Sequence, residues 1–226
     1  MENSYEEGRL LFVKKPVNWT SFDVVRKLRN VLKVKKIGHA GTLDPLATGL
    51  LIIGTGKFTK KLHELQGLNK TYTGVIEIGR TTPSFDLETD FDSEDISWKN
   101  IERLDFEKAR IKFIGEIEQL PPAHSAIKIG GERAYKKARK NKEVNILPRK
   151  IVINEFKIEL DNLPEVRFKV TCSKGTYVRS LANDFGKELG VGAYLKKLVR
   201  TRIGTYKLED AFCLKEIIQQ HNEGSR

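Results

Sequence analysis

One carboxylate, Asp44, stands in a run of small and turn-forming residues that reads GHAGTLDPLATGLL over 38–51. Ionised carboxylates serve enzymes as nucleophiles, and these residue types at this spacing are typical of a built site. The residues alone leave a second interpretation open. In it, Asp44 is the N-cap of a helix and Pro45 takes the first helical position.

Common motifs for cofactor chemistry are missing from the sequence. It contains no GxxxxGK[ST], GxSxG or HExxH, and the GTG at 54–56 lacks the third glycine of a dinucleotide fingerprint. The four histidines are scattered, and Cys172 and Cys213 have no CxxC partner, which favours reduced structural thiols. We therefore expect no metal and no cofactor.

The segments on either side of Asp44 predict the elements that position it. The apolar run that starts at Leu10 predicts a buried strand that ends at Pro16. Thr20 or Ser21 can then cap a helix, whose apolar residues recur at spacings of three and four: Val24, Val25, Leu28, Val31 and Leu32. After the Asp44 run, alternation over 71–79 predicts another strand.

The second half of the chain continues this mixture. Alternating residues over 156–160 and 166–172 predict two half-buried strands. Leu181, Phe185 and Leu189 then predict a helix that stops at Gly190. Because the pattern lacks regular βαβ alternation, we expect an α+β fold with a mixed, largely antiparallel sheet, flanking helices and loops.

Size and charge set broad limits. A chain of 226 residues with 39% hydrophobic residues can bury a core as one large domain, or as one domain with an inserted module. Its formal net charge of +11 indicates a polyanionic partner. The polar, acidic N-terminus and the lack of a long apolar run predict a cytoplasmic protein without a membrane span.

The charges are grouped along the sequence. Lys and Arg dominate 14–36, 128–150 and 167–207, whereas Asp and Glu dominate 86–107. Each segment alone could be a solvated face, but together they predict a polarised surface whose acidic part faces away from the partner. The segment 128–150 is either a lid that orders on the polyanionic partner or a solvated helical hairpin, with a short helix over 134–138.

Five short motifs follow one another along the chain: KPVNWTS at 15–21, the Asp44 run, KTY at 70–72, SAIK at 125–128 and SKGTYVRSL at 173–181, followed by LVRT at 198–201. In this order, from residue 15 to about residue 206, they resemble the motifs of the tRNA pseudouridine synthases of the TruB type. Asn18 departs from the family's usual glycine, but Asn also tolerates a left-handed backbone.

The resemblance implies a reaction and a role for several residues. The family detaches a uracil base from its ribose and rejoins it through C5 without a cofactor. Asp44 matches the nucleophile, which attacks either the sugar or the base. Arg179 matches the arginine that pairs with this carboxylate and keeps its pKa low, and Tyr72 matches a ring that stacks on the uracil and helps to move the C5 proton.

The resemblance also implies how RNA is held. His39 matches the histidine that fills the space left by the extruded base, and Tyr177 and Leu198 match residues that line the uracil pocket. Contacts to the RNA backbone are expected from Lys15, Lys60, Lys128 and Arg139.

The expected substrate is the TΨC stem-loop of tRNA, modified at position 55 by a monomer without a guide RNA. Residues 1–226 would form a single catalytic domain with a basic insertion at about 124–150, and the family's C-terminal PUA-type RNA-binding domain would be absent. Two alternatives stay open at this point. One is a non-catalytic RNA-binding or RNA-chaperone module of the same fold, and the other is a ribonuclease.

Overall fold

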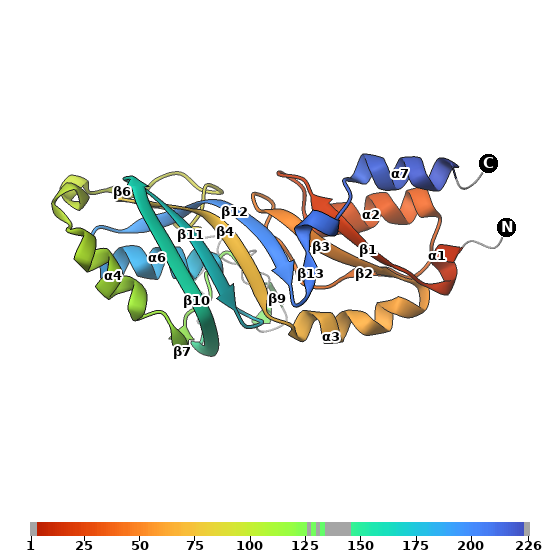
Figure 1. Cartoon of the computed structure of the whole chain (residues 1–226), viewed down its shortest axis with the longest axis horizontal. Coiled ribbons are helices and arrows are strands. Elements are labelled where there is room, and N and C mark those ends of the chain that lie inside the picture. Colours follow the sequence, from red (N-terminus) through yellow and green to blue (C-terminus); the bar gives the residue numbers. More distant parts are fainter. Residues whose placement is uncertain (1–3, 126–127, 130–131, 134–145, 224–226) are drawn as a thin grey trace. The chain divides into compact units, whose positions relative to one another are not determined.

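The computed structural model describes residues 4–125, 128–129, 132–133 and 146–223 (Figure 1). The chain divides into two compact units, one formed by 1–73 with 198–226 and the other by 74–197. Strands β4 (Lys70–Ile78) and β12 (Ala193–Ile203) each contribute residues to both units. The single domain expected over 1–226 stays a prediction.

The first unit is built on strand β3, which pairs antiparallel with β1 and β2 and parallel with β12. Its elements are α1 (Ser4–Glu7), β1 (Leu10–Lys15), α2 (Ser21–Leu32), β2 (Ile37–His39), β3 (Thr48–Thr55), the 3-10 helix η1 (Gly56–Lys61), α3 (Leu62–Gly67), β13 (Tyr206–Lys207), the 3-10 helix η3 (Leu208–Asp210) and α7 (Leu214–Glu223).

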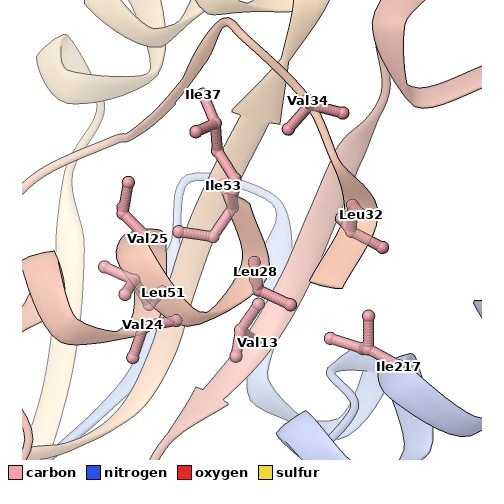
Figure 2. Close-up of a cluster of buried hydrophobic side chains, with 10 residues drawn as sticks. All are labelled: Val13, Val24, Val25, Leu28, Leu32, Val34, Ile37, Leu51, Ile53 and Ile217. Carbon is pink, nitrogen blue, oxygen red and sulfur yellow. The ribbon is translucent and has the colours of Figure 1, made fainter. Parts of the chain in front are cut away.

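Strand β3 is buried on both faces, which explains its continuous apolar sequence. Leu51 and Ile53 face a cluster that includes Leu28 of α2 and Ile217 of α7 (Figure 2). Leu50 and Ile52 face the opposite way, toward a cluster with two leucines of α3. The strand is therefore enclosed on both faces, and it anchors one end of the loop that leads into it.

Helix α2 begins where its sequence predicts. Thr20 is the N-cap, and its side-chain oxygen accepts the backbone N–H of Asp23 at 3.0 Å, while the Asp23 carboxylate accepts the backbone N–H of Thr20. This reciprocal capping box satisfies two amides that the helix leaves unpaired. Lys33, in the left-handed conformation at φ 53°, ends the helix.

The second unit has strands in the order β4, β11, β10 and β7, and the printed pairings of β10 with β11 and with β7 are antiparallel. Phe185 of α6 packs against Phe156 of β10, with ring centroids 5.7 Å apart. The remaining elements and bounds are β5 (Arg80–Thr81), β6 (Ser93–Glu94), the 3-10 helix η2 (Ile96–Asn100), α4 (Arg103–Ile111), β7 (Gly115–Gln119), β8 (Lys128–Ile129), β9 (Glu132–Arg133), β10 (Arg149–Asn162), β11 (Glu165–Cys172) and α6 (Val178–Glu188).

The α+β prediction, with its largely antiparallel sheet, is confirmed, as are the strands expected before Pro16 and over 71–79, 156–160 and 166–172. The helix start considered at Asp44 is wrong, because residues 45–46 form a turn and strand β3 begins at Thr48. Most of the basic insertion, including the helix expected over 134–138, lies outside the described residues. Among the described helices, none has the length and apolar character of a membrane span.

Candidate active site

Asp44 lies in the loop that joins β2 to β3, and its side chain is half-buried. Its own carbonyl accepts the backbone N–H of Ala47 at 3.1 Å, which closes a tight turn through Pro45. The carboxylate therefore belongs to a short, internally bonded loop on the edge of a buried strand. Such a loop can hold a reactive group at a defined place while leaving it partly accessible.

The residue before Asp44 is held by a buried serine. Ser21, only 1% exposed, accepts the backbone N–H of Leu43 at 2.9 Å and donates to its carbonyl at 3.2 Å. One hydroxyl at the start of α2 thus satisfies both backbone groups of Leu43. These two hydrogen bonds fix the Asp44 loop to the start of helix α2.

Pro45, the residue after Asp44, is hydrogen-bonded by residues of the motif 15–21. The Pro45 carbonyl accepts the backbone N–H of Asn18 at 2.9 Å and the Lys15 ammonium at 3.2 Å. Asn18 adopts φ 63°, so the departure from glycine at this position keeps the left-handed turn. The motif 15–21 therefore supports the Asp44 loop.

Lys15 corrects the interpretation made from sequence. Its side chain was expected to contact RNA phosphates, but the residue is 1% exposed and its Nζ also donates to the carbonyls of Pro16 and Trp19. An ammonium enclosed in this way has no free face for a phosphate. Burial lowers the pKa of Lys15 to about 8, while the Asp44 charge acts in the opposite direction and the Arg200 charge lowers it further.

Arg200 is a site residue that sequence reasoning missed. It is 1% exposed, and its guanidinium donates to the carbonyls of Gly41 at 3.1 Å and Thr42 at 3.4 Å. The motif LVRT contains this arginine, but a cation in a strand is ordinarily expected on the surface. Its position two residues after the buried Leu198, on the same face of β12, was the signal available in the sequence.

His39 ends β2 and stands opposite Ile53 of β3. Its side chain is half-buried, and burial lowers its pKa; the Gly41 backbone acts in the opposite direction and the Arg200 cation adds to the lowering. The ring is therefore a neutral imidazole at physiological pH. A neutral aromatic ring is suited to stacking against a nucleobase.

Strand β12 links the Asp44 loop to the strand that carries Tyr72. Arg200 reaches the loop, and the neighbouring Thr201 donates its hydroxyl to the carbonyl of Thr71 at 3.2 Å. Tyr72 and Leu198 are each 8% exposed. These two residues, with His39 and Asp44, thus belong to adjoining strands and loops of one unit.

Arg179 stands in the first turn of α6 in the other unit, and it is buried. Its Nε lies 3.5 Å from a carboxylate oxygen of Asp86, and its other nitrogens donate to the carbonyls of Ser84 at 3.1 Å and His124 at 3.0 Å. These contacts fix the guanidinium in a carbonyl and carboxylate cage. Its pairing with Asp44 stays a prediction.

Tyr177 is the N-cap of α6. The side chain of Gln119 bonds its backbone at both ends, accepting from the N–H at 2.8 Å and donating to the carbonyl at 3.0 Å. The Arg149 guanidinium lies 5.2 Å from the centre of the tyrosine ring. Tyr177 and Arg179 therefore lie two residues apart at the start of α6, and both are hydrogen-bonded within the second unit.

Of the remaining candidates for RNA-backbone contacts, one is described by the structure and two are not. Lys60, in η1, is exposed and fits such a role. The side chain of Lys128 and all of Arg139 lie outside the described residues. Within the described part of the chain, no three His, Cys, Asp or Glu side chains are grouped as a metal site would need.

This chain is similar to known proteins over most of its length. A family model described as TruB family pseudouridylate synthase (N terminal domain) matches residues 29–178. A Flavobacterium johnsoniae protein named tRNA pseudouridine synthase B is 51% identical over 214 residues, covering 92% of this chain and 93% of that protein. A Phocaeicola vulgatus protein of the same name is 48% identical over 218 residues, covering 94% of this chain and 92% of that one.

Among solved structures, the chain is similar to one in the crystal structure of a Cbf5-Nop10-Gar1 complex. The TM-score is 0.76 at 26% identity, and the match covers 98% of this chain. This chain spans only 56% of that longer one.

Proposed function

Because this chain belongs to the TruB family of pseudouridylate synthases, we propose that it converts uridine to pseudouridine at position 55, in the TΨC loop of tRNA. Relatives named tRNA pseudouridine synthase B match more than nine-tenths of the chain, which supports tRNA as the substrate. The net charge of +11 suits a polyanionic partner. We further propose that the enzyme acts in the cytoplasm, as a monomer and without a guide RNA.

The observation that carries this proposal is the construction of the Asp44 loop. Ser21 bonds both backbone groups of Leu43, and Asn18 and Lys15 both donate to the carbonyl of Pro45. An aspartate in an ordinary surface turn needs no such support. Fixing a carboxylate in place before the substrate arrives is what a nucleophile requires.

The reaction rearranges bonds within one nucleotide. The bond between ribose C1′ and uracil N1 breaks, a bond between C1′ and C5 forms, the C5 hydrogen leaves as a proton and N1 takes up a proton. Asp44 would act as the nucleophile, either at the sugar or at the base. Because atoms and electrons balance without a donor or oxidant, the chemistry can be done by side chains alone.

The other residues would hold the carboxylate and the base. Arg179 would pair with Asp44, while Tyr72 would stack on the uracil and assist removal of the C5 proton. Tyr177 and Leu198 would line the uracil pocket. His39 would fill the space left by the extruded base, and its neutral ring suits that stacking role.

The test is release of tritium from tRNA labelled at uridine C5. The wild-type protein should release tritium, and a transcript with cytidine at position 55 should release none. Asp44→Asn should abolish release while tRNA binding stays nearly unchanged, because the amide keeps the shape but is not a nucleophile. Asp210→Asn, at an exposed aspartate of the same unit, is the matched control and should be fully active.

Two results would replace this proposal. If the wild-type protein bound tRNA and released no tritium from any tRNA, a non-catalytic RNA-binding or RNA-chaperone module of this fold would take its place. Strand cleavage during the same incubation would indicate a ribonuclease.

A further inference from the structure

Arg200 is a fully buried cation that is satisfied by backbone carbonyls. Its Nε donates to Leu50 at 2.8 Å, its Nη2 to Gly41 at 3.1 Å and its Nη1 to Thr42 at 3.4 Å. In the part of the chain that the structure describes, no carboxylate forms an ion pair with it. Burying an unpaired charge is costly, so its retention calls for a role that an apolar side chain could not fill.

The backbone around Arg200 lies unusually close to β3. Arg200 stands opposite Gly49 in the parallel pairing of β12 with β3. Gly49 adopts φ +110°, and a Cβ built on it would lie 2.3 Å from the Arg200 carbonyl oxygen and 2.5 Å from its nitrogen. Glycine therefore permits an approach that brings the base of the arginine side chain against the start of the strand.

The three carbonyls lie on both sides of Asp44 in the sequence. Gly41 and Thr42 precede it by three and two residues, and Leu50 belongs to the strand that follows the turn. One guanidinium therefore ties the incoming and outgoing arms of the Asp44 loop together. A planar group with five donors in a fixed fork can do this, whereas a lysine ammonium is a point charge on a flexible stem.

We propose that Arg200 is a positioning residue for Asp44, which holds the loop so that the carboxylate is presented in one orientation to the substrate. This inference rests on the proposed function, in which Asp44 is the nucleophile. It adds a third support to those of Ser21 at Leu43 and Lys15 at Pro45. A nucleophile displaced by about 1 Å can lose about 100-fold in rate.

The test compares Arg200→Lys and Arg200→Met with wild type under single-turnover conditions, at saturating protein over tritium-labelled tRNA. The rate constant at saturation does not depend on the fraction of protein that is folded. We expect it to fall by about 10- to 100-fold in both variants, with the tRNA dissociation constant changed by less than about 3-fold. Arg202→Met, at the exposed arginine two residues along, is the matched control and should keep the wild-type rate.

Amide hydrogen exchange gives a second readout that does not depend on catalysis. In the loop, the amide of Leu43 donates to the Ser21 hydroxyl and that of Ala47 donates to the Asp44 carbonyl, while the amides of β1 and β3 pair in the core sheet. In Arg200→Lys, exchange at 43 and 47 should rise by about 10-fold more than exchange in the β1–β3 ladder. A protein that is merely less stable would exchange faster everywhere.

The outcomes separate the two proposals. Wild-type rates in both arginine variants, or equal acceleration of loop and ladder amides, would overturn the positioning role. A wild-type protein that releases no tritium would overturn the proposed function, while selective loss of loop protection would still support the structural part of this inference.

Discussion

Lys15 and Pro45 are joined by a hydrogen bond of 3.2 Å from a buried ammonium to the carbonyl next to Asp44. Arg200 bonds the carbonyls of Gly41 and Thr42 on the other side of that aspartate. Two enclosed cations therefore support one loop through its backbone. Their charges also act on each other, since Arg200 lowers the pKa of Lys15 while Asp44 acts to raise it.

The lowered pKa of Lys15 predicts a pH-dependent stability. Because burial holds the folded-state pKa near 8, below the ordinary 10.5, the unfolded state binds more protons between these values and stability rises with pH. From pH ~7.5 to ~9.5 the wild-type free energy of unfolding should gain about 2 kcal/mol relative to Lys15→Met. Urea unfolding across this range measures it. Lys14→Met, at the exposed neighbour, should follow wild type, and parallel curves for all three proteins would contradict the assignment.

His39 should titrate below the ordinary histidine range. Burial lowers its pKa from 6.5, so the folded state resists protonation and loses stability as the pH falls through that range. Nitrogen-detected NMR of the imidazole, assigned by loss of the signal in His39→Gln, should show a midpoint below 6.5. Arg200→Met should raise that midpoint, because a neighbouring cation is removed. A wild-type midpoint above 6.5 would be incompatible with a neutral stacking ring.

The Arg179–Asp86 pair should be strongly coupled, because both side chains are less than 8% exposed and lie 3.5 Å apart. Asp86→Asn should reduce the free energy of unfolding by about 3 kcal/mol, since it removes the charge of one partner of a buried ion pair. In a double-mutant cycle with Arg179→Met, the coupling energy should exceed about 1 kcal/mol. The exposed pair Arg103–Asp161, at 3.8 Å, is the control, and its coupling should be close to zero. Additive effects at Arg179 and Asp86 would refute the coupling.

RNA binding should weaken with salt. If about five phosphates are neutralised, the log of the binding constant for a TΨC stem-loop should fall with the log of salt concentration at a slope of about −3 to −5. Lys60→Gln should reduce the magnitude of that slope by about 1, because it removes one exposed cation. Lys99→Gln, in the acidic segment, should leave the slope unchanged. An affinity indifferent to salt would rule out a phosphate-binding surface.

Local patterns predicted the elements that have one buried face. Alternation marked β11 and spacings of three and four marked α2, because each buries one side and exposes the other. The spacing of four also marked α6, although eight of its eleven residues are buried. Strand β3 has no such signature, since both of its faces are covered. The burial of both faces of β3 depends on the elements that pack against it, so the sequence of the strand alone does not predict it.

The charge of a residue predicted its exposure less reliably than hydrophobic patterns predicted the helices and strands. Lys15 and Arg200 carry the same formal charge as the exposed Lys60, and sequence alone assigns all three to the surface. What encloses the first two is the convergence of carbonyls from distant segments, which depends on tertiary structure. Likewise, the contact of Asp86 with Arg179 comes from the fold and not from a local pattern.

The close approach at Gly49 also restricts how this protein can change. Any side chain introduced there would meet main-chain atoms of Arg200, which cannot move aside as a flexible neighbouring side chain could. In a randomised library selected for activity, variants with alanine or a larger residue at position 49 should therefore be inactive. Substitutions at other positions should not restore their activity. Only glycine should be recovered at position 49, so this position is unsuitable for engineering. A substitution of Gly49 in a related sequence would indicate that the close approach of the two strands has been lost.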